Sequence, residues 1–265
     1  MKILWMRIDK RILMYSFGIA LILPLYQIYA TLTGSFDYKR NIFLDSPYTL
    51  WMGITSYQFA TMAYFLVLPL LAAMPAAILI RKDINNGFFW QLRIKRSTKE
   101  VVLSYTSWSF LLGGLIAAIP LLINFIGYFL VVPNIKPDNL MNINILVINR
   151  NTLLVALYYM HPFLHVGLNL FLVFIWGGLF SLFVTASSIF IRNGHFVFTF
   201  AFLLQLILLI INAFGMVKNS ISPTDFLSET AMGDISGQLT LLLTLFMVTL
   251  TIGLVRKGMK RVGDI

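Results

Sequence analysis

The chain has 265 residues, of which 59% are hydrophobic and 11% are charged, with a mean hydropathy of +0.85 and a formal net charge of +10. An average soluble domain has about a quarter charged residues and under half apolar ones, and it needs a polar surface. The composition therefore excludes a cytosolic enzyme and a disordered or collagen-like protein, and it predicts an integral membrane protein. The chain contains no Cys, which excludes disulfides, a thiolate nucleophile and thiolate metal ligands.

Segments without Asp, Glu, Lys or Arg mark the expected membrane spans, because a helix needs about 20 apolar residues to cross the hydrocarbon core. A short apolar and basic segment, about residues 1–11, precedes the first of them and suits a helix lying at the inner interface. The sequence predicts an all-α integral membrane protein, a single transmembrane domain over residues 1–265 with six membrane-spanning helices. These spans are expected at about residues 12–32, 57–80, 101–132, 165–191, 195–217 and 237–255.

The basic residues are distributed unequally between the connecting segments. If the N-terminus is cytoplasmic, 15 of the 20 Lys and Arg residues lie on the cytoplasmic side. The other side then holds only Lys39, Arg40, Lys136, Arg150 and Lys218. Because cytoplasmic loops carry an excess of Lys and Arg, both termini are predicted to be cytoplasmic and the chain is expected in the plasma membrane.

The cytoplasmic segment 81–100, between the second and third spans, has an amphipathic pattern. Ile84, Phe88 and Leu92 recur at i, i+4 and i+8, so that they would share one face of a helix whose far end is basic. Ser97 and Glu100 form a capping-box pattern that predicts the start of the third span. Two interpretations remain open at this point: a basic interfacial helix on anionic headgroups, and a docking helix for a cytoplasmic partner.

On the other side of the membrane, segment 218–236 contains Ser222-Pro-Thr-Asp225, a helix-start signal followed by a short amphipathic stretch. His161 and His165 precede the fourth span at i and i+4, a spacing that a metal site can use. No acid lies near them in sequence, so ordinary interfacial histidines are favoured and no metal site is expected.

Small and polar residues inside the spans predict how the helices pack. Gly113-Gly114 and Gly177-Gly178 indicate places where helices approach closely or bend. A further group of polar residues would either line a transport path or form hydrogen bonds between helices, and the second interpretation is favoured. This group is Gln27, Gln58, Asn124, Asn169, Gln205 and Asn212.

The sequence lacks the residues that several kinds of transport and catalysis need. No Asp, Glu, Lys or Arg lies clearly within a predicted span, which counts against a proton-driven transporter. There is no Gly-x-Ser-x-Gly sequence for a Ser hydrolase and no Gly-x-x-x-x-Gly-Lys-Ser/Thr loop for ATP. We therefore expect no catalytic residues and no cofactor bound by this chain; if ATP drives the protein, another subunit must bind it.

The layout resembles the membrane (permease) subunit of a type-2 ATP-binding cassette (ABC) transporter. In that family the turn after the second span typically reads Arg-Glu-x-x-x-Gly, followed by a Leu-rich segment. Here it reads Lys82-Asp83-Ile84-Asn85-Asn86-Gly87-Phe88, with Asp in the acid position and Phe-Phe-Trp where Leu or Thr is usual. The basic tail Arg256-Lys-Gly-Met-Lys-Arg261 also resembles the family.

This resemblance implies a function and partners. The chain would be a transport subunit and not an enzyme, working as a homodimer or heterodimer, with ATP and Mg on separate cytoplasmic ABC ATPase subunits. Segment 218–236 would be an external re-entrant gate, and the cargo would be an amphiphilic or hydrophobic peptide, lipid or drug. Nucleic acid is not an expected partner, membrane lipids are, and the high Ile, Asn and Lys content indicates a bacterial source. The coupling helix that contacts the ATPase would comprise Asp83, Asn86, Gly87, Phe88, Phe89, Trp90, Leu92 and Arg93.

Two alternatives belong to other classes. The first is an accessory or immunity-type membrane protein that binds a peptide or a membrane partner without transport. The second is an intramembrane enzyme that uses His161 and His165. A cytoplasmic ATPase that depends on the coupling helix would distinguish the transporter from both.

Overall fold

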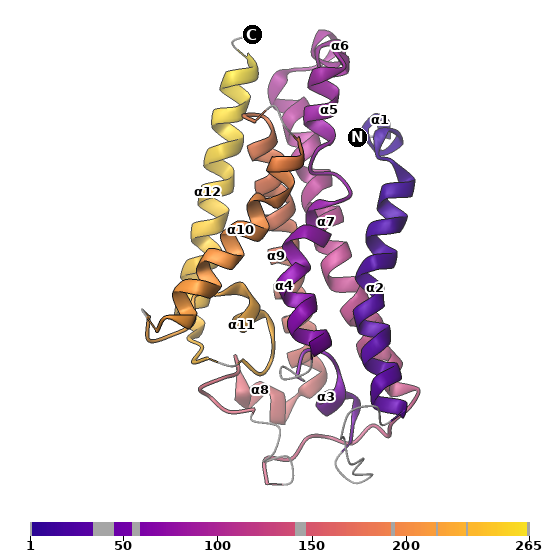
Figure 1. Ribbon diagram of the computed structural model, residues 1–265, viewed down its shortest axis with the longest axis vertical. Helices are drawn as coiled ribbons and strands as arrows, with labels where there is room; N and C mark the ends of the chain where they lie inside the picture. The colour runs from indigo at the N-terminus through magenta and orange to yellow at the C-terminus, as the bar shows by residue number, and fades with distance from the viewer. Residues whose placement is uncertain are drawn as a thin grey trace.

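The secondary structure of the described part of the chain is entirely helical (Figure 1). The computed structural model describes residues 2–33, 45–54, 59–140, 147–191, 194–215, 217–231 and 233–263. The predicted all-α class is confirmed for these residues. Their helices are α1 (Lys2–Arg7), α2 (Lys10–Thr33), α3 (Pro47–Leu50), α4 (Phe59–Ala73), α5 (Leu79–Asn85), α6 (Phe88–Lys95), α7 (Thr98–Phe129), α8 (Val155–Met160), α9 (Pro162–Ser188), α10 (Gly194–Ala213), α11 (Pro223–Leu227) and α12 (Gly237–Gly263).

Four of these helices, α2, α7, α9 and α12, are long and apolar enough to cross a membrane, and α4 and α10 are shorter apolar helices. The six lie over the six charge-free segments of the sequence. Such a set of helices indicates a multi-pass membrane protein.

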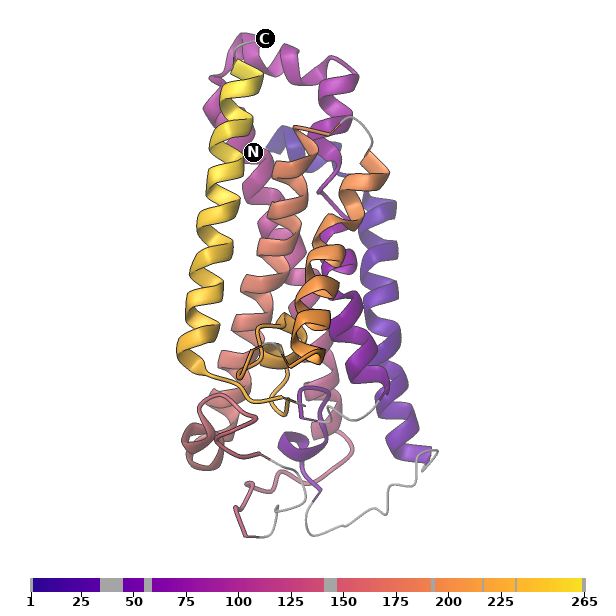
Figure 2. The same cartoon turned by 60° about the vertical axis from the view of Figure 1, so that its left-hand side comes forward.

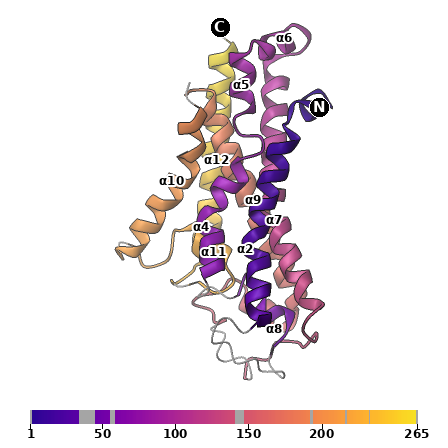
Figure 3. The same ribbon diagram turned by 45° about the vertical axis from the view of Figure 1, so that its right-hand side comes forward.

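Helices α7 and α9 form the centre of the bundle and make its most extensive helix–helix contact. In the most apolar stretch of each helix, 67% of the residues are buried in α9 and 50% in α7, but only 22% in α2 and in α12. Figure 2 shows α2 and α12 at opposite edges of the bundle, and Figure 3 shows α10 leaning away from it. Most of the large exposed side chains between the ends of α2 and α12 are apolar, so these parts of the helices present lipid-compatible surfaces, whereas the last turns of α12 carry exposed basic residues.

Glycine pairs set the close approach of α7 and α9. A Cβ atom on Gly113 would collide with the Ser181 side chain and lie 2.8 Å from the carbonyl oxygen of Gly177. A Cβ atom on Gly177 would in turn collide with the side chain of Ala117. The close approach predicted from these glycines is confirmed, and it follows from the small-residue packing typical of membrane helices.

The second predicted span is not one continuous helix. Helix α4 ends at Ala73, and a turn over residues 74–78 separates it from α5, because Pro75 cannot continue the hydrogen-bond ladder. Pro69, inside α4, also lacks the N–H that would bond to the Phe65 carbonyl oxygen. That oxygen instead accepts a hydrogen bond of 2.7 Å from Gln205 Nε2 on α10.

The connecting segments group at two ends of the bundle (Figure 1). One end, which we call the terminal end, holds α1, α5, α6 and the end of α12. The opposite end, the distal end, holds α3, α8 and α11. This grouping is the one that the alternation of spans predicts for segments 81–100 and 218–236.

Candidate functional site

The segment between α4 and α7 forms two short helices at the terminal end. The expected single helix with Ile84, Phe88 and Leu92 on one face is wrong, because α5 stops at Asn85 and α6 begins after Gly87. Gly87 has a φ of 77°, a left-handed conformation that glycine adopts without strain. We call α5, the turn and α6 the α5–α6 hairpin.

Asp83 anchors the α5–α6 hairpin to two other helices. Its side chain is fully buried, forms an ion pair with Arg7 of α1, and accepts a hydrogen bond of 2.6 Å from the hydroxyl of Tyr105 on α7. The guanidinium of Arg7 also lies 4.1 Å from the ring centre of Phe88, a cation–π contact. The hydrogen bond to Asp83 raises the pKa of Arg7, so Arg7 stays charged. Asp83 therefore acts inside the chain rather than on its surface.

Phe89 is likewise buried within the chain, with 0% of its surface exposed. Its ring stacks on Tyr105 at a centroid distance of 6.3 Å and meets the edge of Trp90 at 5.5 Å. Trp90 and Leu92 are partly buried against the same apolar cluster, which α7, α9 and α12 complete. Phe89, which the resemblance places in the contact with an ATPase, therefore packs inside the chain.

Arg93 joins the α5–α6 hairpin to the end of α12. Its Nη1 donates a hydrogen bond of 2.6 Å to the carbonyl oxygen of Val262, and its Nη2 donates one of 3.3 Å to that of Gly263. These carbonyls belong to the last turn of α12, where no intrahelical donor is left. Because α12 continues to Gly263, the basic tail is helical, beyond the expected end of the last span at residue 255.

A polar face of the α5–α6 hairpin remains on the surface. Its one large apolar side chain, Ile94, is 84% exposed. We define the hairpin face as the exposed residues between positions 85 and 96, which are Asn85, Asn86, Gln91, Ile94, Lys95 and Arg96. Of the residues predicted to contact a partner, only Asn86 is on this face; Gly87, Phe88, Trp90, Leu92 and Arg93 are half-buried, and Asp83 and Phe89 are buried.

At the distal end, Glu229 fixes segment 218–236 to the bundle. Its carboxylate is buried and lies 3.1 Å from Nδ1 of His165 on α9, and it accepts a hydrogen bond of 3.2 Å from Nε1 of Trp51. The other ring nitrogen of His165 lies 2.7 Å from the carbonyl oxygen of Leu153. The backbone N–H of Glu229 donates to the carbonyl oxygen of Gly53 at 2.8 Å. Sequence reasoning missed this carboxylate, because 64 positions separate it from His165.

Further hydrogen bonds hold the same segment. Asp225 of α11 accepts hydrogen bonds from Asn212 at 2.8 Å and from Ser220 at 2.5 Å. Burial raises the pKa of Asp225. The N–H of Ala231 donates to the carbonyl oxygen of Asn151 at 3.0 Å. Segment 218–236 therefore lies across the distal end and is bonded to the segments that precede α4 and α8 and to α9 and α10.

The two histidines singled out in the sequence do not form one site. His165 is buried beside Glu229, whereas His161 is exposed at the joint between α8 and α9. Among the described residues, no group of three or more His, Cys, Asp or Glu side chains is arranged to hold a metal ion.

The polar residues of the spans bond to neighbouring helices and segments. Asn124 of α7, for example, donates to Gln27 Oε1 of α2 at 2.7 Å. The favoured interpretation as hydrogen bonds between elements is confirmed for the described members of the group, while Gln58 lies outside the described residues. These members are Gln27, Asn124, Asn169, Gln205 and Asn212.

Comparison with protein-family models, with curated proteins and with solved structures gives no match for this chain. A function must therefore be argued from the residues and the geometry.

Proposed function

We propose that this chain is the membrane-spanning subunit of an ATP-driven exporter of the type-2 ABC kind, in a bacterial plasma membrane. Six helices would cross the membrane, with α4 and α5 together forming the second span and both termini in the cytoplasm. The chain would pair with an identical or homologous subunit and move an amphiphilic or hydrophobic peptide, lipid or drug. Separate cytoplasmic subunits would bind and hydrolyse ATP with Mg.

The attachment of the α5–α6 hairpin carries this proposal. The hairpin is bonded to α1 and α7 through Asp83 and to the end of α12 through Arg93. A force applied to the hairpin would therefore reach the ends of several membrane helices rather than bend a loose loop. A partner that changes shape on ATP hydrolysis needs such a connection to alternate the access of a cavity between two protomers.

The hairpin face fits a polar protein groove better than a lipid surface. It combines amide side chains with the basic Lys95 and Arg96 around one exposed apolar residue, Ile94. A partner groove that buried Ile94 inside a rim of polar contacts would match this composition, because protein interfaces surround their buried apolar contacts with a polar rim. Segment 218–236, bonded across the distal end, supports the matching role of an outer gate.

The proposal is tested by purifying the tagged chain from its native membrane in mild detergent and identifying the proteins that accompany it. We expect a stoichiometric P-loop ATPase. The variant Ile94→Asp should lose it, because a charge would be buried in the interface. Lys260→Gln is a matched control, since it also lowers the net charge by one, at an exposed position of the same end outside the hairpin face.

Two results would contradict the proposal. The chain could purify without an ATPase in every mild detergent, which would favour the accessory or immunity-type protein. Alternatively, Ile94→Asp and Lys260→Gln could retain the ATPase equally, which would remove the hairpin face as the contact.

A further inference from the structure

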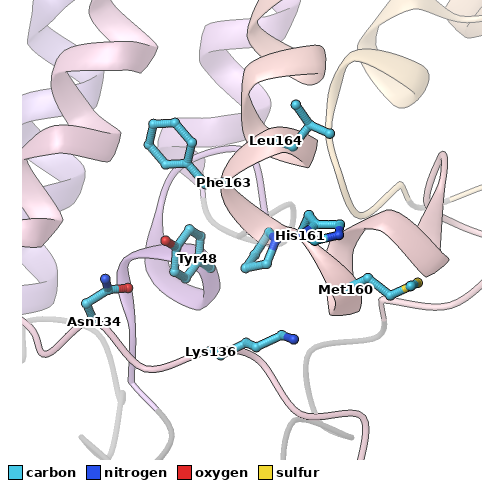
Figure 4. Close-up of a pocket in the computed structure, with 8 residues that line it drawn as sticks. Tyr48, Asn134, Lys136, Met160, His161, Phe163 and Leu164 are labelled. Atoms are coloured by element: carbon cyan, nitrogen blue, oxygen red, sulfur yellow. The ribbon is translucent and has the colours of Figure 1, made fainter.

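A pocket of about 650 Å³ lies at the distal end, between α3, the segment after α7 and the joint of α8 and α9 (Figure 4). Segments far apart in the sequence build it. Its lining consists of Tyr48, Asn134, Lys136, Met160, His161, Pro162, Phe163 and Leu164.

The floor of the pocket is fixed by aromatic packing. The ring of Tyr48 is buried and lies 5.8 Å from the ring centres of both Phe125 and Phe129. The hydroxyl of Tyr158 donates a hydrogen bond of 3.2 Å to the carbonyl oxygen of Tyr48. Because these contacts come from three different elements, the floor is formed before any ligand arrives.

Polarity changes across the pocket between the side of the helix bundle and the side of the distal end (Figure 4). Phe163 and Leu164 lie on the side of the helix bundle, and Asn134 and Lys136 lie on the side of the distal end (Figure 4). Phe163 is 68% exposed and Leu164 is 54% exposed, so both offer apolar surface to a neighbour. A membrane lipid beside α9 has the same order, with its chains toward the bilayer centre and its headgroup outward.

The charge of the polar side is positive. Lys136 supplies an ammonium, His161 supplies an imidazole, and none of the described residues that line the pocket is acidic. The nearest acid in sequence, Asp138, accepts a hydrogen bond of 2.8 Å from the backbone N–H of Leu140 and does not line the pocket.

We propose that this pocket binds an anionic phospholipid of the leaflet at the distal end. The headgroup phosphate lies against Lys136, with Asn134 and His161 as further hydrogen-bond donors, and one acyl chain runs along Phe163 and Leu164. The site requires that α9 crosses a membrane, for which it is long and apolar enough. It does not require an ATPase, so it can fail or hold independently of the proposed function.

The test uses the purified full-length chain, stripped of lipid in an uncharged detergent and titrated with phosphatidylglycerol or phosphatidylcholine while binding is followed by native mass spectrometry. We expect phosphatidylglycerol to bind more tightly. Lys136→Gln should weaken its binding about fivefold, the effect of one Lys near an anionic lipid. Lys218→Gln, an exposed lysine of the same end outside the pocket, should leave binding unchanged.

Competition separates the lipid from a free anion. Glycerol phosphate, which has the headgroup charge but no acyl chains, should not displace phosphatidylglycerol at equal concentration. Equal displacement would overturn the lipid as occupant. Equal loss of binding in Lys136→Gln and Lys218→Gln would overturn the pocket, because it would show attraction to the overall charge of the distal end.

Discussion

Two buried carboxylates hold the ends of this molecule together. Asp83 joins the α5–α6 hairpin to α1 and α7, and Glu229 joins segment 218–236 to α9 and to Trp51. A carboxylate removed from water is stable only if its oxygens find donors or positive charge. Both therefore fix the chain segments that carry them, and Asp83 does so where the proposed mechanism needs a firm attachment.

We expect Asp83→Asn to destabilise the terminal end. Removing one partner of a fully buried ion pair costs about 3–5 kcal/mol, but the Arg7 side chain is 34% exposed and can turn to water, so we expect a loss of about 2 kcal/mol. Thermal unfolding in detergent measures it. Tyr105→Phe, which removes only the hydroxyl donor, should cost about 1 kcal/mol.

An unfolding temperature of Asp83→Asn equal to that of the native chain would show that the ion pair contributes nothing. The role of Asp83 as an anchor of the α5–α6 hairpin would then be wrong.

Sequence reasoning at the scale of residues found the positions but not their partners. Asp83 and Gly87 stand out in the sequence because an acid precedes a glycine by four positions in a turn between two spans. Arg7 lies 76 positions from Asp83, and this contact depends on how α1 folds back over α7. The burial of Phe89 has the same cause: an amphipathic pattern shows that a face is apolar, but not whether the chain or a partner covers it.

At the scale of elements, the absence of charge located the apolar helices, and local residues explain their interruptions. Pro75 interrupts the second span between α4 and α5, and the left-handed Gly87 divides the hairpin into two helices. The spacing of apolar residues does not show where a helix is interrupted. The prediction that Ile84, Phe88 and Leu92 share one helix face is therefore wrong. The start of α7 was predictable from the capping-box pattern of Ser97 and Glu100. In the structure, the Ser97 side chain accepts a hydrogen bond from the backbone N–H of Glu100.

The contact of α7 with α9 makes a prediction about small residues. Gly113→Ala should destabilise the bundle by about 1–3 kcal/mol, since its Cβ atom would collide with Ser181 and lie 3.0 Å from the carbonyl oxygen of Ala72. Gly18→Ala is the matched control, because nothing lies within 4 Å of the Cβ atom it would add to α2. It should leave stability unchanged or raise it.

Unfolding temperatures of the two variants in the same detergent measure the difference. If Gly113→Ala were as stable as Gly18→Ala, α7 and α9 would be able to separate without cost, and the glycine pairs would not set their distance.

At the scale of the whole molecule, the bundle divides into a terminal end, where the chain ends and the α5–α6 hairpin meet, and a distal end closed by segment 218–236 (Figure 1). Both proposals depend on which end faces the cytoplasm. The hairpin can reach an ATPase only from the cytoplasmic side, and the lipid pocket then lies in the opposite leaflet. The excess of Lys and Arg at the terminal end predicts that this end is cytoplasmic.

The orientation can be measured directly because the chain has no cysteine of its own. Lys218 and Lys257 are exposed at the distal and terminal ends, respectively, and neither lines the lipid pocket or belongs to the hairpin face. A membrane-impermeant maleimide should label Lys218→Cys in intact cells, and it should label Lys257→Cys only after the membrane is permeabilised. The reverse pattern would place the α5–α6 hairpin outside the cell, where no ATP is available, and would exclude the exporter. Labelling of both variants in intact cells would place positions 218 and 257 on the same side of the membrane. This requires an even number of spans between them, so α12 could not cross the membrane as proposed.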